Sequence, residues 1–163
     1  VRQTRDLDTI YKLLHFLDHQ KINILILGTK KDHFIQLLKD DMKKEKFNNV
    51  YFFKDLSENF SISDQAFSAY KSIGYVGSAT GTMGFFGLLN KKVILVNAPS
   101  YYADKYWDNF TFLYKKIFNK KNKFTQVFTW KKYYDHNEDE IIENSYDEIR
   151  LAIEKKILNK NGI

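Results

Sequence analysis

The chain's densest group of glycine and hydroxyl residues lies at residues 77–84, which read Gly-Ser-Ala-Thr-Gly-Thr-Met-Gly. Glycine lets a backbone approach a bulky anion, and the first amide hydrogens of a helix have no partner inside the helix. Such amides bind phosphate readily, because the helix dipole adds partial positive charge there. The hydroxyls of Ser78, Thr80 and Thr82 can donate further hydrogen bonds, and Gly81 lies between the last two. This spacing therefore favours a phosphate or diphosphate site.

The same segment also fits a purely structural turn between a strand and a helix. In that interpretation Thr80 caps the helix, while Gly81, Gly84 and Gly87 let the helix pack closely on the sheet. The segment has neither the Gly-Lys-Ser/Thr ending of a P-loop nor the Gly-x-Gly-x-x-Gly spacing of a dinucleotide site. Residue spacing alone leaves both interpretations open.

The other candidate binding residues are single side chains. Arg2 precedes the first expected helix and could make the bidentate phosphate contact that arginine favours. Asp55 and Asp64 flank a serine-containing loop, and Asp64 also suits the first turn of a helix. We expect no metal site and no cofactor, because the histidines lack ligand spacing and the chain has no cysteine.

These residues must be positioned by alternating strands and helices. Apolar runs predict buried strands at residues 22–27, 50–53, 73–76 and 93–96. Helical spacing of apolar residues predicts intervening helices at 7–17, 31–45, 62–70 and 80–89. Beyond Pro99 the pattern predicts a strand at 125–130 and a helix at 138–158. Strands that are apolar throughout indicate an α/β fold with an open, doubly wound, Rossmann-like parallel sheet and helices on both faces.

Composition is typical of one globular domain spanning residues 1–163. Apolar residues make up 44% of the 163 residues and charged residues 28%, which excludes a disordered chain. The longest apolar runs are strand-sized and far too short to span a membrane. Because the chain begins with Val1 rather than Met, we expect it to be a fragment of a longer two-domain protein.

Positive charge is concentrated between Lys115 and Lys132, within a stretch that contains no acidic residue. A solvated, lysine-rich loop is one interpretation of this segment, since it lacks the regular spacing of an amphipathic basic helix. The alternative is a peripheral contact with the anionic inner face of a membrane. We expect no nucleic-acid partner.

Three stretches resemble the carboxyl-terminal half of glycosyltransferases with the two-Rossmann-domain (type B) fold. They are Ser-Ile-Ser-Asp-Gln-Ala-Phe at 61–67, Ile-Gly-Tyr-Val-Gly-Ser-Ala-Thr-Gly-Thr-Met at 73–83, and Leu-Leu-Asn-Lys-Lys-Val-Ile-Leu-Val-Asn-Ala-Pro at 88–99. Heptosyltransferase-like enzymes have a strand, a glycine turn, a helix and a second strand there, although Ala79 stands where they commonly have Asp. The opening Val-Arg-Gln-Thr-Arg-Asp is similar to a strand end of fucosyltransferase-like enzymes.

This resemblance implies a cytoplasmic donor-binding domain for a nucleoside-diphosphate sugar, in surface-polysaccharide or glycoconjugate synthesis. The sugar would pass to a glycan or lipid-linked acceptor, with the general base on the other domain and no catalytic residue assigned here. A non-catalytic interaction domain and a sugar-nucleotide epimerase are the alternatives. The expected diphosphate ligands are Arg2, Ser78, Thr80, Gly81 and Thr82, and the expected nucleotide contacts are Gly28, Thr29, Asp55 and Asp64.

Overall fold

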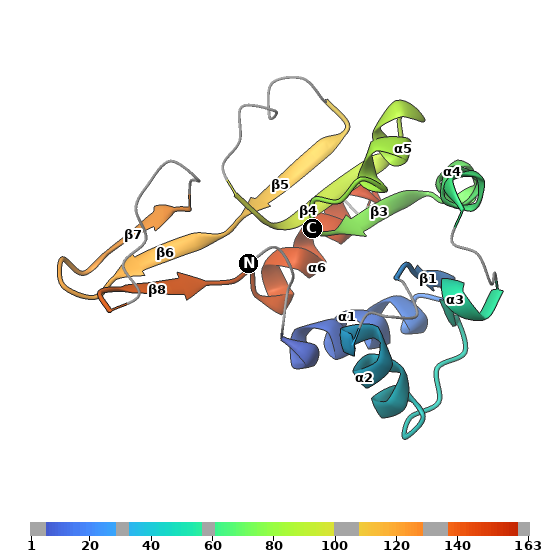
Figure 1. The fold of residues 1–163 in the computed structure, drawn as a ribbon, viewed down its shortest axis with the longest axis horizontal. Coiled ribbons are helices and arrows are strands. Elements are labelled where there is room, and N and C mark those ends of the chain that lie inside the picture. The colour runs from blue at the N-terminus through green and yellow to red at the C-terminus, as the bar shows by residue number, and fades with distance from the viewer. Residues whose placement is uncertain (1–5, 29–32, 57–60, 100–107, 129–136, 160–163) are drawn as a thin grey trace. The chain divides into compact units, whose positions relative to one another are not determined.

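The computed structural model describes residues 6–28, 33–56, 61–99, 108–128 and 137–159 (Figure 1). The chain divides into two compact units, an amino-terminal unit (Asp6–Gln65) and a carboxyl-terminal unit that begins at Ala66. Each unit contains helices together with parallel strands, which confirms an α/β fold. Among the described residues no helix is both long and apolar enough to cross a membrane.

The amino-terminal unit is a pair of parallel strands covered by helices. Its strands β1 and β2 pair in register from Ile24 opposite Val50 to Ile26 opposite Phe52. Its core is formed by Leu14, Ile35, Leu38, Met42 and Phe52. The elements are α1 (Leu7–His19), β1 (Ile24–Ile26), α2 (His33–Met42), β2 (Val50–Phe52), α3 (Phe53–Leu56) and the beginning of α4 (Ile62–Lys71).

The carboxyl-terminal unit is built around a three-stranded parallel sheet in the order β3-β4-β5. Its central strand β4 (Lys92–Ala98) is buried at every residue after Lys92. Residues buried on both faces are what a central strand of a covered parallel sheet requires. The neighbouring elements are β3 (Gly74–Gly77), α5 (Met83–Leu88) and β5 (Phe110–Tyr114).

Helices pack on both faces of this parallel sheet. On one face the Tyr75 ring of β3 packs against Phe86 of α5, with ring centroids 4.9 Å apart. On the other face a Cβ on Gly74 would lie 3.1 Å from a side-chain atom of Ile157, at the end of α6 (Tyr146–Lys156). Successive residues of a strand point to opposite faces, so α5 and the end of α6 lie on opposite sides of β3.

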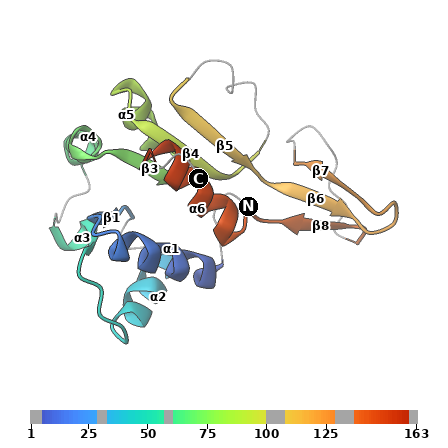
Figure 2. The same cartoon turned by 180° about the vertical axis from the view of Figure 1, so that it is seen from behind.

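Beyond β5 the chain leaves the parallel sheet and enters a three-stranded antiparallel sheet, with β6 between β7 and β8. Figures 1 and 2 show β5 running directly into β6. The single residue between them, Lys115, is in neither strand, but its backbone is hydrogen-bonded on both sides. Its amide donates to the Ala98 carbonyl, and its own carbonyl accepts from the Phe128 amide, both at 2.8 Å. The strands are β6 (Lys116–Asn119), β7 (Phe124–Val127) and β8 (Asp139–Ile142).

The expected helix at 138–158 is wrong over its first third. Asp139–Ile142 forms β8, where Ile141 and Ile142 lie opposite Ile117 and Lys116 of β6. The helix begins only at Tyr146, because Ser145 caps it. The Ser145 hydroxyl accepts from the Glu148 amide and the Glu148 carboxylate accepts from the Ser145 amide, which is a capping box.

Candidate functional site

The predicted phosphate-binding segment leaves the parallel sheet at the carboxyl end of β3. We call residues 78–82 the glycine turn. Gly77, the last residue of β3, lies opposite Leu95 of β4, so the glycine turn is beside the end of β4. The carboxyl edge of a parallel sheet is where open α/β folds hold their ligands. The structure therefore brings Ser78, Thr80, Gly81 and Thr82 together at this edge.

The helix that follows the glycine turn is shorter than expected, and this corrects one part of the predicted site. The helix α5 begins at Met83 rather than at residue 80. The amides of Met83, Gly84 and Phe85 donate to the carbonyls three residues earlier, each at 3.2 Å. The unpaired first-turn amides expected from the sequence are thus already bonded, because the turn before α5 winds as a tight 3₁₀-type turn.

The backbone amides that remain available as donors lie before α5, in the glycine turn. Within the described residues, the amides of Ala79, Thr80 and Gly81 have no hydrogen-bond acceptor. Thr80 and Gly81 are exposed. A Cβ built on Gly81 would meet no protein atom within 4 Å. Accessible consecutive amides beside open space can bind an anion.

Thr80 does not act as the side-chain cap that the structural interpretation required. The N-cap position of α5 is Thr82, whose backbone is right-handed helical and whose side chain makes no capping hydrogen bond. The Thr80 hydroxyl lies 3.5 Å from the Tyr75 hydroxyl. The Tyr75 hydroxyl also donates to the Ser78 carbonyl at 3.0 Å. Burial raises the pKa of Tyr75, so this hydroxyl keeps its proton at neutral pH and acts as a donor.

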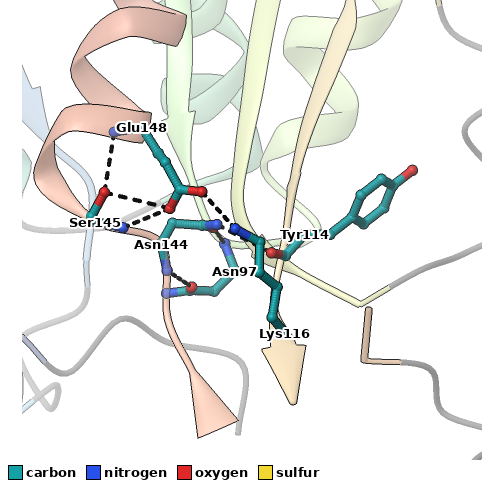
Figure 3. A network of polar contacts seen from close by, with 6 residues as sticks. All are labelled: Asn97, Tyr114, Lys116, Asn144, Ser145 and Glu148. Carbon is teal, nitrogen blue, oxygen red and sulfur yellow. Dashed lines mark hydrogen bonds and ion pairs between the residues drawn. The ribbon is translucent and has the colours of Figure 1, made fainter. Parts of the chain in front are cut away.

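The neighbouring end of β4 is closed by a buried pair of asparagines (Figure 3). The Asn97 amide donates to the Asn144 side-chain oxygen at 2.6 Å, and the Asn144 amide donates to the Asn97 side-chain oxygen at 2.7 Å. Asn97 has a φ of 52°, a left-handed conformation that asparagine tolerates. Strand β4 therefore continues through Asn97 to Ala98, instead of ending at Val96 as predicted.

Further polar contacts join Asn144 to β5, and join β6 to α6 beside it. The Asn144 side-chain amide donates to the Tyr114 carbonyl at 3.1 Å. Lys116 of β6 contacts Glu148 of α6 at 2.7 Å, as Figure 3 shows. Nothing in the sequence predicted these contacts, because Asn97 and Asn144 are 47 positions apart.

The amino-terminal unit contains the nucleotide contacts expected from the sequence, and each described one has a structural role. A Cβ on Gly28 would lie 2.6 Å from Ile35 of α2, so this glycine permits close packing of the helix on the strand. Both Asp55 oxygens contact Lys39, at 2.5 and 2.6 Å. The Asp64 carboxylate accepts from the Ser61 amide and the Ser61 hydroxyl at the start of α4. The expected contacts Arg2 and Thr29 lie outside the described residues.

Several lysines of the lysine-rich segment pair with carboxylates in the folded chain. Lys115 is buried, with its ammonium 3.5 Å from Glu143. Lys116, Lys120 and Lys121 also lie within 4 Å of a carboxylate oxygen, on α6 or on the residues around β8. Acidic residues distant in sequence thus neutralise much of this charge. The described parts of the chain contain no group of three or more acidic or histidine side chains arranged to hold a metal ion.

A hollow of about 420 Å³ lies in the amino-terminal unit beside α1 and the end of α2. It contains none of the residues expected from the sequence. Polar contacts join its lining residues, including His15 with Glu45 at 2.5 Å and the ion pair of Lys12 with Asp8 at 2.6 Å. Its lining residues are Asp8, Tyr11, Lys12, His15, Asp41, Lys44 and Glu45.

Comparison of the chain with protein-family models, curated proteins and solved structures finds no match. The function of the glycine turn is therefore inferred from its own residues and geometry.

Replacing Asn144 with alanine tests the asparagine pair at the end of β4. Asn144→Ala leaves the buried Asn97 amide without its acceptor and the Tyr114 carbonyl without that donor. We expect the free energy of unfolding to fall by about 2–4 kcal/mol, measured by urea unfolding followed by circular dichroism. Asn122→Ala, at an exposed turn residue, is the matched control and is expected to change stability by less than about 0.5 kcal/mol. Equal stability of the two variants would contradict the assignment.

The Glu148 carboxylate predicts a loss of stability in acid. Burial alone would raise the pKa of Glu148, but hydrogen bonds from Lys116 and from the Ser145 amide outweigh burial and lower it. A carboxyl whose pKa is lower in the folded than in the unfolded protein stabilises the fold at neutral pH, and that stabilisation disappears on protonation. We therefore expect the free energy of unfolding to fall from about pH 6 to about pH 3, and to fall less in Glu148→Gln.

Urea unfolding across this pH range measures the free energy of unfolding of the wild type and of Glu148→Gln. Asp147→Asn removes an exposed carboxyl from the same turn of α6 without removing the Lys116 contact, so it should retain most of the wild-type loss. Identical pH profiles for the wild type and Glu148→Gln would show that the Lys116–Glu148 contact contributes nothing.

Proposed function

We propose that this chain is the donor-binding domain of a glycosyltransferase, holding a nucleoside-diphosphate sugar for transfer to a glycan or lipid-linked acceptor. The diphosphate lies against the glycine turn in this proposal. The resemblance of residues 61–99 to type B glycosyltransferases points to the same reaction class.

The observation that carries the proposal is the set of free donors in the glycine turn. The amides of Ala79, Thr80 and Gly81 have no acceptor among the described residues, and they lie where the chain leaves a parallel strand. The open space at Gly81 lets a phosphate oxygen approach the backbone. Hydroxyls on Ser78 and Thr82 add side-chain donors of the kind that phosphate accepts.

The finer fold assignment, an open doubly wound Rossmann-like sheet, belongs to this proposal. Parallel pairing of β3, β4 and β5 supports it, as does the packing of α5 and α6 on opposite faces of β3. Strands β1 and β2 of the amino-terminal unit also pair in parallel, in a separate two-stranded sheet.

In the proposed reaction the acceptor displaces the nucleoside diphosphate at the anomeric carbon of the sugar. The acceptor oxygen bonds to that carbon as the bond between the carbon and the diphosphate oxygen breaks, and negative charge develops on the leaving diphosphate. The proton of the acceptor hydroxyl passes to a general base. Fixed amide dipoles at the glycine turn stabilise this charge, because they already point to the position where it forms. We assign no general base to this chain. We also leave a membrane contact out of the proposal, since Lys115, Lys116, Lys120 and Lys121 are paired with carboxylates.

Isothermal titration of the chain with UDP, GDP, CDP and ADP tests the proposal, with Gly81→Ala as the informative variant. The added methyl group meets no protein atom within 4 Å, so the fold should tolerate it. It occupies the space through which a phosphate approaches the amides. We expect at least one nucleotide to bind the wild type, and Gly81→Ala to bind it about tenfold more weakly.

Gly84→Ala is the matched control. Its methyl group also enters open space, but its amide is already bonded to the Gly81 carbonyl. It should bind nucleotide within about twofold of the wild type. Equal nucleotide affinities of Gly81→Ala and Gly84→Ala would show that the glycine turn does not bind the nucleotide. Failure of all four nucleotides to bind the wild type would overturn the proposal and favour a non-catalytic interaction domain.

A further inference from the structure

Tyr75 makes a side-chain hydrogen bond to a backbone atom of the glycine turn, and the proposed mechanism does not use it. From the middle of β3 its side chain extends along the strand, past Gly77, to the start of the turn. Its hydroxyl donates to the Ser78 carbonyl at 3.0 Å and lies 3.5 Å from the Thr80 hydroxyl. A residue of the strand therefore contacts the turn at two points.

Gly77 provides the room for this contact. Tyr75 and Gly77 point to the same face of β3, because they are two residues apart on a strand. A Cβ on Gly77 would lie 2.8 Å from the Tyr75 hydroxyl and 3.1 Å from its ring. No side chain larger than hydrogen leaves the tyrosine in place.

The ring of Tyr75 also packs against the helix α5. Phe86 of α5 is 3% exposed and packs against the ring with centroids 4.9 Å apart. With the ring fixed by Phe86 and by the strand, the hydroxyl has a defined position from which to hold the Ser78 carbonyl. Burial also raises the pKa of Tyr75, which keeps the hydroxyl protonated as a donor.

The hydrogen bond to Ser78 determines the direction of the next amide. The Ser78 carbonyl and the Ala79 N–H belong to one planar peptide unit, in which the C=O and N–H bonds of a trans peptide point in opposite directions. The structure contains no cis peptide bond among its described residues. Because the carbonyl points toward Tyr75, the Ala79 N–H points away from Tyr75, and it has no acceptor within the described residues.

We propose that Tyr75 is a positioning residue that fixes the Ser78–Ala79 peptide plane, so that the free amides of the glycine turn face a bound diphosphate. This inference rests on the proposed function for the identity of the ligand. The effect on the turn itself requires no ligand. Tyr75 contacts the turn and not the nucleotide, so its removal should loosen the turn while leaving every free donor present.

Tyr75→Phe removes the hydroxyl and keeps the ring that packs on Phe86. In the variant without nucleotide, we expect the ¹⁵N order parameters of the Ala79, Thr80 and Gly81 amides to fall from about 0.85 toward about 0.6. The buried amides of Ile94 and Leu95 in β4 should keep wild-type values, which separates loosening of the turn from loss of the fold. In titrations with UDP, GDP, CDP and ADP, the nucleotide that binds the wild type should bind about 3- to 10-fold more weakly.

Tyr70→Phe is the matched control, because it removes a tyrosine hydroxyl from an exposed side chain of α4. It should retain wild-type order parameters in the turn and wild-type affinity. A second variant, Gly77→Ala, tests the same contact without changing Tyr75, because its methyl group displaces the Tyr75 hydroxyl. Its order parameters and affinity should change in the same direction as those of Tyr75→Phe.

Unchanged order parameters in Tyr75→Phe would overturn the inference, whatever nucleotide binding shows. A looser turn with unchanged nucleotide affinity would also overturn it, and would leave the proposed function intact. If no nucleotide binds the wild type, the proposed function fails and the positioning of a diphosphate fails with it. A looser turn would then support only the Tyr75 contact with Ser78.

Discussion

The burial of β4 is the constraint on which the carboxyl-terminal unit depends. Six consecutive residues of this strand are buried, so each backbone amide and carbonyl needs a partner within the protein. Parallel ladders to β3 and β5 provide most of these partners. Where the ladder to β5 shifts register, between Leu95 and Ala98, the side chain of Asn144 supplies the acceptor for Asn97. Lys115 then supplies a donor to the Ala98 carbonyl. The strand that follows β5 and the segment before α6 are therefore held in place by the backbone requirements of β4.

This requirement makes the two adjacent strand ends chemically different. At the end of β4, Asn97 and Asn144 satisfy each other and are almost completely buried. At the end of β3, the chain turns into solvent, and the amides from Ala79 to Gly81 have no acceptor among the described residues. Buried polar groups are satisfied in native proteins, and accessible free donors are the groups that remain for a ligand. The contrast selects the glycine turn, rather than the asparagine pair, as the place where this edge of the sheet can bind an anion.

Local patterns in the sequence predicted the strands around the glycine turn and the general position of the turn. Val93–Val96 is apolar throughout, and its parallel partners are buried or half-buried strands, which is what a covered parallel sheet produces. The helix at 138–158 was mispredicted at its start because Ile141 and Ile142 suit a helix locally, whereas pairing with β6 holds them in a strand. Lys115 and Asn144 were missed for a related reason: their burial depends on partners far away in the sequence. Nothing local distinguishes Tyr75, whose contact with Ser78 depends on Phe86, which packs on its ring, and on Gly77, which leaves room for it.

The most direct test of the account is amide NMR of the ¹⁵N-labelled chain during titration with each of the four nucleoside diphosphates. A phosphate that accepts hydrogen bonds from the backbone shifts the amides that donate them more than amides elsewhere. The account predicts that the largest saturable shifts occur at Ala79, Thr80 and Gly81, with small shifts at the bonded amides of Ile94 and Leu95. Saturable shifts centred on other residues, such as those lining the hollow beside α1, would contradict it. Absence of any shift in the glycine turn would contradict it equally.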